Sequence, residues 1–173
     1  MKLYKTKKIV DADAEVGFLS LIFASGLYTG FMPFASGTFG SIFGSLFFFL
    51  KDFQRAEILI PSIIICALIS IPASKEVMKK YGDDPSVIVI DEVIGMWISV
   101  LVFQFFNGIS SDLNFKNLII VFLCFRLFDI IKIQPSKYFD DMKSATGVIL
   151  DDVIAGIYAG VAAYLITLVI AKL

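Results

Sequence analysis

Residues 87–106 read VIVIDEVIGMWISVLVFQFF, an apolar run of 20 residues that carries two adjacent acids, Asp91 and Glu92, near its start. A helix needs about 20 mainly apolar residues to cross the hydrocarbon core of a bilayer. An ionised carboxylate inside a membrane is costly, and it faces a cavity or a partner rather than lipid. This stretch therefore predicts a membrane-spanning helix with a polar site near one end.

The composition of the whole chain also indicates a membrane protein. Of the 173 residues, 58% are hydrophobic and 18% are charged, and the mean hydropathy is +0.85. Soluble domains carry about 25% charged residues, and a chain this small cannot bury so much apolar surface in one water-soluble core. The net charge of −1 gives no basic surface, so we expect no nucleic-acid partner. The absence of histidine excludes Ser-His-Asp triads and histidine-ligated zinc.

Further apolar stretches cover residues 16–50, 58–73, 118–133 and 148–171. Proline and glycine residues between 33 and 40 break the first of these, so we expect a piece ending near residue 32, a turn, and a helix from about Thr38. Pro72 should end the helix that begins near residue 58. The predicted fold is all-α: a polytopic transmembrane bundle of about four to five spans with a broken or re-entrant N-terminal segment.

The positive charges are unevenly divided between the two sides of this topology. Residues 1–15 carry four lysines, residues 74–86 three and residues 132–147 three, whereas the opposite loops and the C-terminus together carry four Lys or Arg. Cytoplasmic loops are the ones enriched in Lys and Arg. We therefore expect a cytoplasmic N-terminal arm over residues 1–15 and a single integral-membrane catalytic domain over residues 16–173.

Acids gather at the cytoplasmic ends of the apolar stretches, at Asp84, Asp91, Glu92, Asp129, Asp151 and Asp152. So many carboxylates at one depth would repel each other unless a cation compensates them. Oxygen ligands alone select a hard metal, Mg²⁺ first and Mn²⁺ second. The acids therefore predict a metal site. Four other acids fall in loops and are expected to be solvated: Asp83, Asp112, Asp140 and Asp141.

Two cations accompany these acids. Arg126, Asp129 and Lys132 follow an i, i+3, i+6 spacing, so one helix face can present a metal ligand between two phosphate-binding cations. Alternatively, Arg126 and Asp129 form only an ion pair within the membrane. Alternatively, Asp151 and Asp152 only complement a helix N-terminus.

Small residues mark two further places. The segment GTFGS at 37–41 is either a broken helix with close glycine packing or a helix N-terminus that offers N–H groups, Thr38 and Ser41 to a phosphate. In the last apolar stretch Asp152 shares a helix face with Gly156 and Gly160, where another helix can approach closely.

Four blocks of the sequence resemble the phosphatidylglycerophosphatase A family. They read GTFGS at 37–41, DPSVIVIDEVIGMW at 84–97, FRLFDIIK at 125–132 and GVILDDVIAG at 147–156, in the order of the family. The resemblance implies a Mg²⁺-dependent enzyme of the bacterial inner membrane that meets membrane lipids and hydrolyses the terminal phosphate of phosphatidylglycerophosphate. The uneven lysine distribution adds the expectation that this site faces the cytoplasm. The chain departs from the family where Ile133 replaces a frequent proline and where SATG at 144–147 precedes the acid pair.

The resemblance places the metal-binding acids on Asp84, Asp91, Glu92, Asp129, Asp151 and Asp152. It places the catalytic groups on Asp91, Glu92, Arg126, Asp129 and Lys132. Attack by a water deprotonated by Asp91 or Glu92 and attack through an aspartyl-phosphate are both compatible with these residues.

Two other functions use similar residues. A CDP-alcohol phosphatidyltransferase would need a DGxxAR…GxxxDxxxD pattern, which the sequence lacks. A cation transporter would show repeated broken helices, and only one apolar stretch here is broken.

Overall fold

The computed structural model describes residues 9–83, 85–108 and 113–172, and every regular element within these ranges is helical. The predicted all-α fold is therefore confirmed. The elements are, in order, α1 (Phe18–Ala24), the 3-10 helix η1 (Thr29–Phe31), α2 (Ser36–Leu46), the 3-10 helix η2 (Phe47–Phe49), α3 (Ala56–Tyr81), α4 (Ile90–Asn107), α5 (Phe115–Ile131), α6 (Ser136–Asp140) and α7 (Ala145–Ile170).

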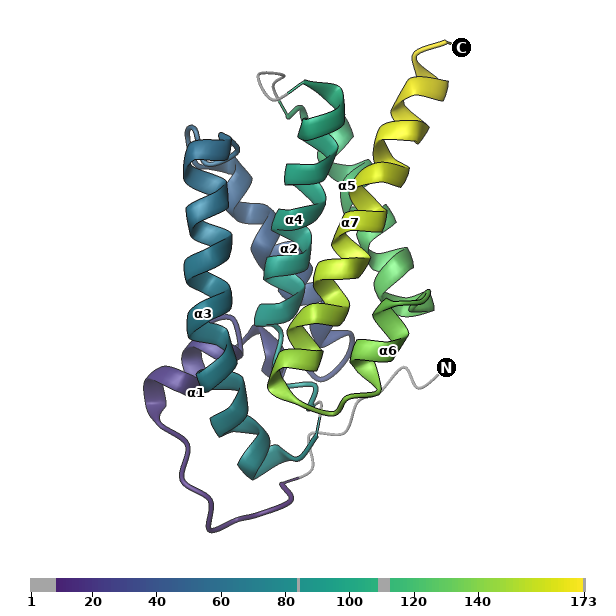
Figure 1. Ribbon diagram of the computed structural model, residues 1–173. Helices are drawn as coiled ribbons and strands as arrows, with labels where there is room; N and C mark the ends of the chain where they lie inside the picture. Colours follow the sequence, from purple (N-terminus) through teal and green to yellow (C-terminus); the bar gives the residue numbers. More distant parts are fainter. Residues whose placement is uncertain (1–8, 84, 109–112, 173) are drawn as a thin grey trace.

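Helix α4 lies at the centre of the bundle, with α2, α3, α5 and α7 around it (Figure 1). Within an apolar stretch of 18 residues in each helix, 72% of the residues of α4 are buried, compared with 22% in α3 and 28% in α7. The outer helices instead turn large apolar side chains outward, among them Leu68 and Val169. Contiguous exposed apolar surface of this kind is typical of a protein that meets a membrane.

Within the described ranges, three helices, α3, α4 and α7, are long and apolar enough to cross a membrane. Helix α5 has 17 residues, and α2 with η2 forms a shorter apolar run over Ser36–Phe49. The expected number of four to five spans is thus approximate, while the all-helical fold and its apolar helices agree with the predicted membrane bundle.

The N-terminal apolar stretch is broken, as predicted. With seven residues, α1 is only about 10 Å long and cannot cross a bilayer. The stretch instead packs against the start of α4: the Val89 N–H donates to the Ala24 carbonyl over 2.9 Å, and a Cβ on Gly30 would overlap the Val87 carbonyl. These contacts fix the position at which α4 begins.

The prediction that Pro72 ends its helix is wrong, because α3 continues to Tyr81. The turns after Pro72 are stabilised by tertiary contacts. Val77 is fully buried, and the Glu76 carboxylate accepts a 2.7 Å hydrogen bond from the Gly17 N–H. These contacts outweigh the proline penalty, which is about 3 kcal/mol in a helix interior. Residues 74–81 are therefore helix rather than loop.

Helices α4 and α7 cross where their glycines meet, which confirms the predicted close approach. A Cβ on Gly156 would lie 2.5 Å from the Gly95 carbonyl oxygen, and a Cβ on Gly160 would lie 2.7 Å from the Ser99 carbonyl oxygen. The two backbones therefore come together at positions that only glycine allows. This crossing brings the first turns of α4 and α7 to the same end of the bundle (Figure 1).

Replacing Gly156 should loosen this crossing. We expect Gly156→Val to lower stability by about 1–3 kcal/mol, because the added side chain overpacks the contact with Gly95. Thermal unfolding in detergent measures the change, with Ile157→Val on the exposed face of the same helix as the control. An unfolding temperature equal to that of the control would contradict the close crossing.

Candidate functional site

The first turn of α4 carries two of the predicted site acids. Asp91 and Glu92 follow Ile90, the first residue of the helix, and their exposed fractions are only 5% and 7%. Residues 85–89 are not helical, so the helix begins three residues later than the apolar run. The hydrogen bond that the Val89 N–H donates to the Ala24 carbonyl holds this start in place.

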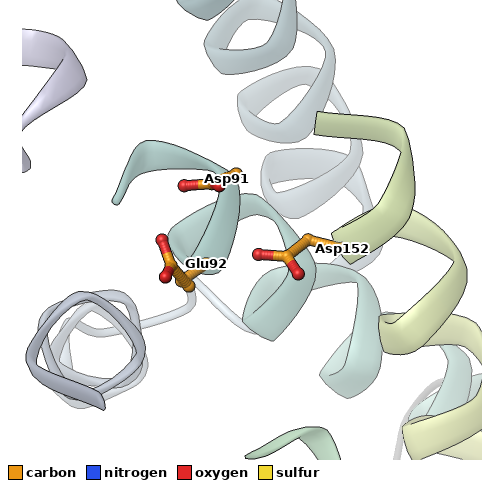
Figure 2. A group of neighbouring side chains, drawn as sticks. All are labelled: Asp91, Glu92 and Asp152. Atoms are coloured by element: carbon orange, nitrogen blue, oxygen red, sulfur yellow. The ribbon is translucent and has the colours of Figure 1, made fainter. Parts of the chain in front are cut away.

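A third buried acid reaches the same place from α7. Asp152 is 3% exposed and lies across from Asp91 and Glu92 (Figure 2). One carboxylate oxygen from each of the three residues lies within 4.8 Å of the others. The glycine crossing of α4 and α7 lies one turn along each helix, and it brings these carboxylates together. We call Asp91, Glu92 and Asp152 the carboxylate cluster.

The electrostatics of the cluster favour a bound cation. Asp152 also experiences the negative charges of Asp129, Asp151 and Glu92. Among the described residues, neither Glu92 nor Asp152 is in an ion pair, and Glu92 Oε2 is buried without a hydrogen-bond partner. Buried carboxylates without compensation are strongly unfavourable. A cluster of oxygen donors alone fits a hard divalent cation such as Mg²⁺.

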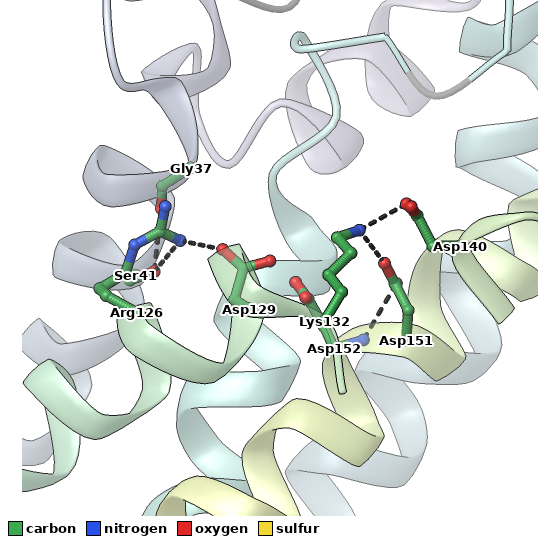
Figure 3. A network of polar contacts seen from close by, with 8 residues as sticks. All are labelled: Gly37, Ser41, Arg126, Asp129, Lys132, Asp140, Asp151 and Asp152. Atoms are coloured by element: carbon green, nitrogen blue, oxygen red, sulfur yellow. Dashed lines mark hydrogen bonds and ion pairs between the residues drawn. The ribbon is translucent and has the colours of Figure 1, made fainter. Parts of the chain in front are cut away.

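The side chain of Arg126 extends from α5 toward α2, beside the cluster. Its Nη1 contacts Asp129 Oδ2 at 2.8 Å and Ser41 Oγ at 3.2 Å, and the Ser41 hydroxyl donates to the Gly37 carbonyl at 2.9 Å (Figure 3). A Cβ on Gly37 would overlap Glu92 Oε1 and lie 3.3 Å from the guanidinium nitrogens. Glycine at this position therefore allows the start of α2 to fit between Arg126 and the cluster.

Lys132 lies at the other edge of the cluster. Helix α5 ends at Ile131, and Lys132 follows in the left-handed region with φ of 49°. This turn directs its Nζ toward Asp140 of α6 and Asp151 of α7 (Figure 3). Burial lowers the pKa of Lys132, but the charge of Asp151 and the hydrogen bonds to both carboxylates raise it above its usual range. Lys132 is thus fully protonated at neutral pH.

The structure divides the predicted acids into groups. Asp91, Glu92 and Asp152 form the cluster, whereas Asp129 pairs with Arg126 and Asp151 pairs with Lys132. Asp84 lies outside the described residues. Thr38 is half-buried beside Gly37 in the first turn of α2. The ligand and phosphate-binding roles of all these residues stay predictions.

One residue of this network was not predicted. Asp140 was expected to be a solvated loop charge, and this is wrong, because its half-buried carboxylate contacts Lys132. No signal in the sequence marks it, since the two residues are eight apart and lie on different elements. Asp83 and Asp141 are exposed as expected, and Asp112 lies outside the described residues.

The chain is similar to known lipid phosphatases. The sequence model of the family phosphatidylglycerophosphatase A matches residues 22–167. A Bacteroides thetaiotaomicron protein, provisionally named a phosphatidylinositol-3-phosphatase, is 31% identical over 82% of this chain and 89% of its own length.

Two other relatives are each named phosphatidylglycerophosphatase A. The Haemophilus influenzae protein is 28% identical over 84% of this chain and 86% of its own length. The Escherichia coli protein is 27% identical over 84% of this chain and 81% of its own length. No solved structure matches the chain significantly.

Proposed function

The chain belongs to the phosphatidylglycerophosphatase A family, and we propose that it removes the terminal phosphate of phosphatidylglycerophosphate to leave phosphatidylglycerol. The observation that carries this proposal is the carboxylate cluster, buried between two helices and flanked by Arg126 and Lys132. Such a site combines cation ligands with groups that bind phosphate oxygens. Family membership favours hydrolysis over the phosphatidyltransferase and transporter alternatives.

The cluster would hold Mg²⁺ through Asp91, Glu92 and Asp152. When bound, the ion would polarise the phosphoryl group and acidify a water molecule. The surrounding bundle contributes burial, which strengthens every charge interaction at the site. Asp84, Asp129 and Asp151 are the additional ligands that the family resemblance predicts.

Arg126 is the best-placed residue to bind the phosphoryl oxygens. Its contacts with Asp129 and Ser41 both use Nη1, and the guanidinium has further N–H donors for a phosphate. Asp129 and Ser41 hold the side chain in one orientation, which lowers the entropy lost on binding. Lys132 would bind the same group from the opposite edge.

A second substrate is favoured by one observation. The Bacteroides relative is named for a 3-phosphate on phosphatidylinositol, which is also a phosphomonoester on a lipid head group. Both activities need the same cation and phosphate contacts and differ only in head-group fit. Phosphate release from each lipid, presented to the purified protein in detergent micelles, decides between them. Hydrolysis of neither lipid would contradict the proposed function.

Metal removal should abolish this activity. We expect turnover to fall to background in EDTA and to return with Mg²⁺ or Mn²⁺, because three buried carboxylates cannot bind a phosphate without a cation between them. The measurement is phosphate release after chelation and after metal is added back. Full activity in EDTA would show that the carboxylate cluster does not work through a metal.

We also propose that the cluster faces the cytoplasm of a bacterial cell. The lysine-rich ends of the helices support this orientation under the positive-inside rule. Single cysteines at Lys137 and Lys116, both exposed and at opposite ends of α5–α6, test it.

An impermeant maleimide applied to intact cells should label Lys116→Cys and spare Lys137→Cys. Both native cysteines, Cys66 and Cys124, are buried, so the parent protein gives the background. Labelling of residue 137 alone would show the opposite orientation, with the cluster outside the cytoplasm, and would contradict the proposal.

A further inference from the structure

The ammonium group of Lys132 forms ion pairs with two carboxylates that differ in their surroundings. Asp151 belongs to α7, its side chain is 5% exposed, and it also accepts the Asp152 N–H at 3.0 Å. Asp140 is the last residue of the five-residue helix α6, and its side chain is 32% exposed. The two contacts are therefore an internal one and a peripheral one (Figure 3).

We propose that Asp140 competes with the phosphoryl group for Lys132: it occupies the ammonium group in the free protein and is displaced when the phosphate binds. The inference rests on the proposed function, because it takes Lys132 as a phosphate ligand. Asp140 is then neither a metal ligand nor a catalytic residue. It sets how tightly the site holds substrate and how readily it releases phosphate.

The difference in exposure decides which carboxylate leaves. A carboxylate that moves into water regains its hydration, whereas one that loses its partner inside the bundle does not. Asp151 would become an unpaired buried charge, but Asp140 only needs to rotate away at the edge of the site. Rotamer changes of exposed side chains are fast, on the order of picoseconds to nanoseconds.

The charge balance of the site supports the same conclusion. Carboxylates outnumber cations around Lys132, since Asp151 and Asp152 act on it as well as Asp140. An incoming phosphate adds further negative charge and is repelled by each carboxylate that stays. Asp140 is the more exposed of the two carboxylates that contact Lys132. Its departure therefore relieves this repulsion with the smaller loss of free energy.

Inorganic phosphate binding to the detergent-solubilised protein with Mg²⁺ tests the proposal. We expect Asp140→Asn to bind phosphate about fivefold more tightly. A partly exposed ion pair that must be broken before phosphate binds raises the dissociation constant by up to about this factor. The readouts are a ³¹P NMR titration and the inhibition of lipid hydrolysis by phosphate. KM for the lipid should fall together with the inhibition constant. The matched control is Asp141→Asn, which removes the same charge from the exposed neighbouring residue and should leave binding unchanged.

Two further variants separate the possible outcomes. Lys132→Met should weaken phosphate binding, and adding Asp140→Asn to it should have no effect. Unchanged or weaker binding in Asp140→Asn, with Lys132→Met still harmful, would overturn the competition and leave the proposed function intact. If Lys132→Met binds phosphate normally, Lys132 is not a phosphate ligand and the inference fails with it. Asp140→Ser, which is too short to reach the lysine, replaces Asp140→Asn if that variant is not monodisperse.

Discussion

Asp152→Asn is expected to lower kcat for lipid phosphate hydrolysis by at least about 100-fold while the bundle stays folded. A metal ion contributes several kcal/mol of charge stabilisation to such a reaction, and about 1.4 kcal/mol corresponds to a factor of ten. Asp152 is 3% exposed, and its carboxylate meets those of Asp91 and Glu92 within 4.8 Å. Asparagine keeps its size but removes one of the charges that would hold the cation.

The stability of Asp152→Asn should not fall with its activity. In the metal-free protein the three carboxylates repel each other, so a neutral side chain at residue 152 relieves repulsion inside the bundle. We therefore expect an unfolding temperature in EDTA equal to or above that of the unmodified protein. The control is Asp141→Asn, which removes the same charge at an exposed position.

Two measurements on Asp152→Asn complete this test. Thermal unfolding in detergent follows stability, and electron paramagnetic resonance of bound Mn²⁺ follows affinity for the metal. The variant should lose Mn²⁺ binding together with turnover. Retained Mn²⁺ binding with full turnover would remove Asp152 from the site.

The helices of this protein could be predicted from the sequence because their cause is local. A run of apolar residues long enough to cross a bilayer forms a helix wherever it is inserted, since its backbone groups must bond to each other. The end of α3 depended on distant residues instead. Gly17 and the core around Val77 extend the helix beyond Pro72, and no feature near Pro72 indicates their presence.

The sequence predicts which acids belong to the site, but not which groups each of them contacts. Acids in apolar segments marked Asp151 and Asp152, and neighbouring helical residues point about 100° apart. Their partners then follow from tertiary packing: Asp152 joins Asp91, while Asp151 meets Lys132. Lys132 itself left the expected helix face because α5 ends one residue earlier. These partners depend on how α5 and α7 pack against each other, and the spacing of residues within one helix does not predict that packing.

The ion pair between Arg126 and Asp129 leads to the second large effect. The two groups are 2.8 Å apart and only 16% and 15% exposed. If Asp129 serves only to neutralise Arg126, then Asp129→Asn leaves a cation uncompensated, and removing both charges should restore the protein. Breaking a fully buried pair costs about 3–5 kcal/mol, and less where both groups keep some contact with solvent.

We expect the opposite result, because we propose that Asp129 is an additional ligand of the cation as well as the partner of Arg126. Its negative charge also acts on Asp152 in the carboxylate cluster, which supports this proposal. Asp129→Asn should therefore fold and lose nearly all turnover. The double variant Asp129→Asn, Arg126→Gln should fold as well and stay inactive, because it lacks the proposed phosphate contact and one of the charges that would attract the metal.

Size-exclusion chromatography in detergent and phosphate release distinguish the two roles of Asp129. Ser41→Ala is a matched control, since it removes the other hydrogen bond to Arg126 and leaves every charge in place. It should raise KM more than it lowers kcat, because Arg126 keeps its charge but is held less firmly. Recovery of activity in the double variant would show that Asp129 only compensates Arg126, and the cation would then depend on the carboxylate cluster without it.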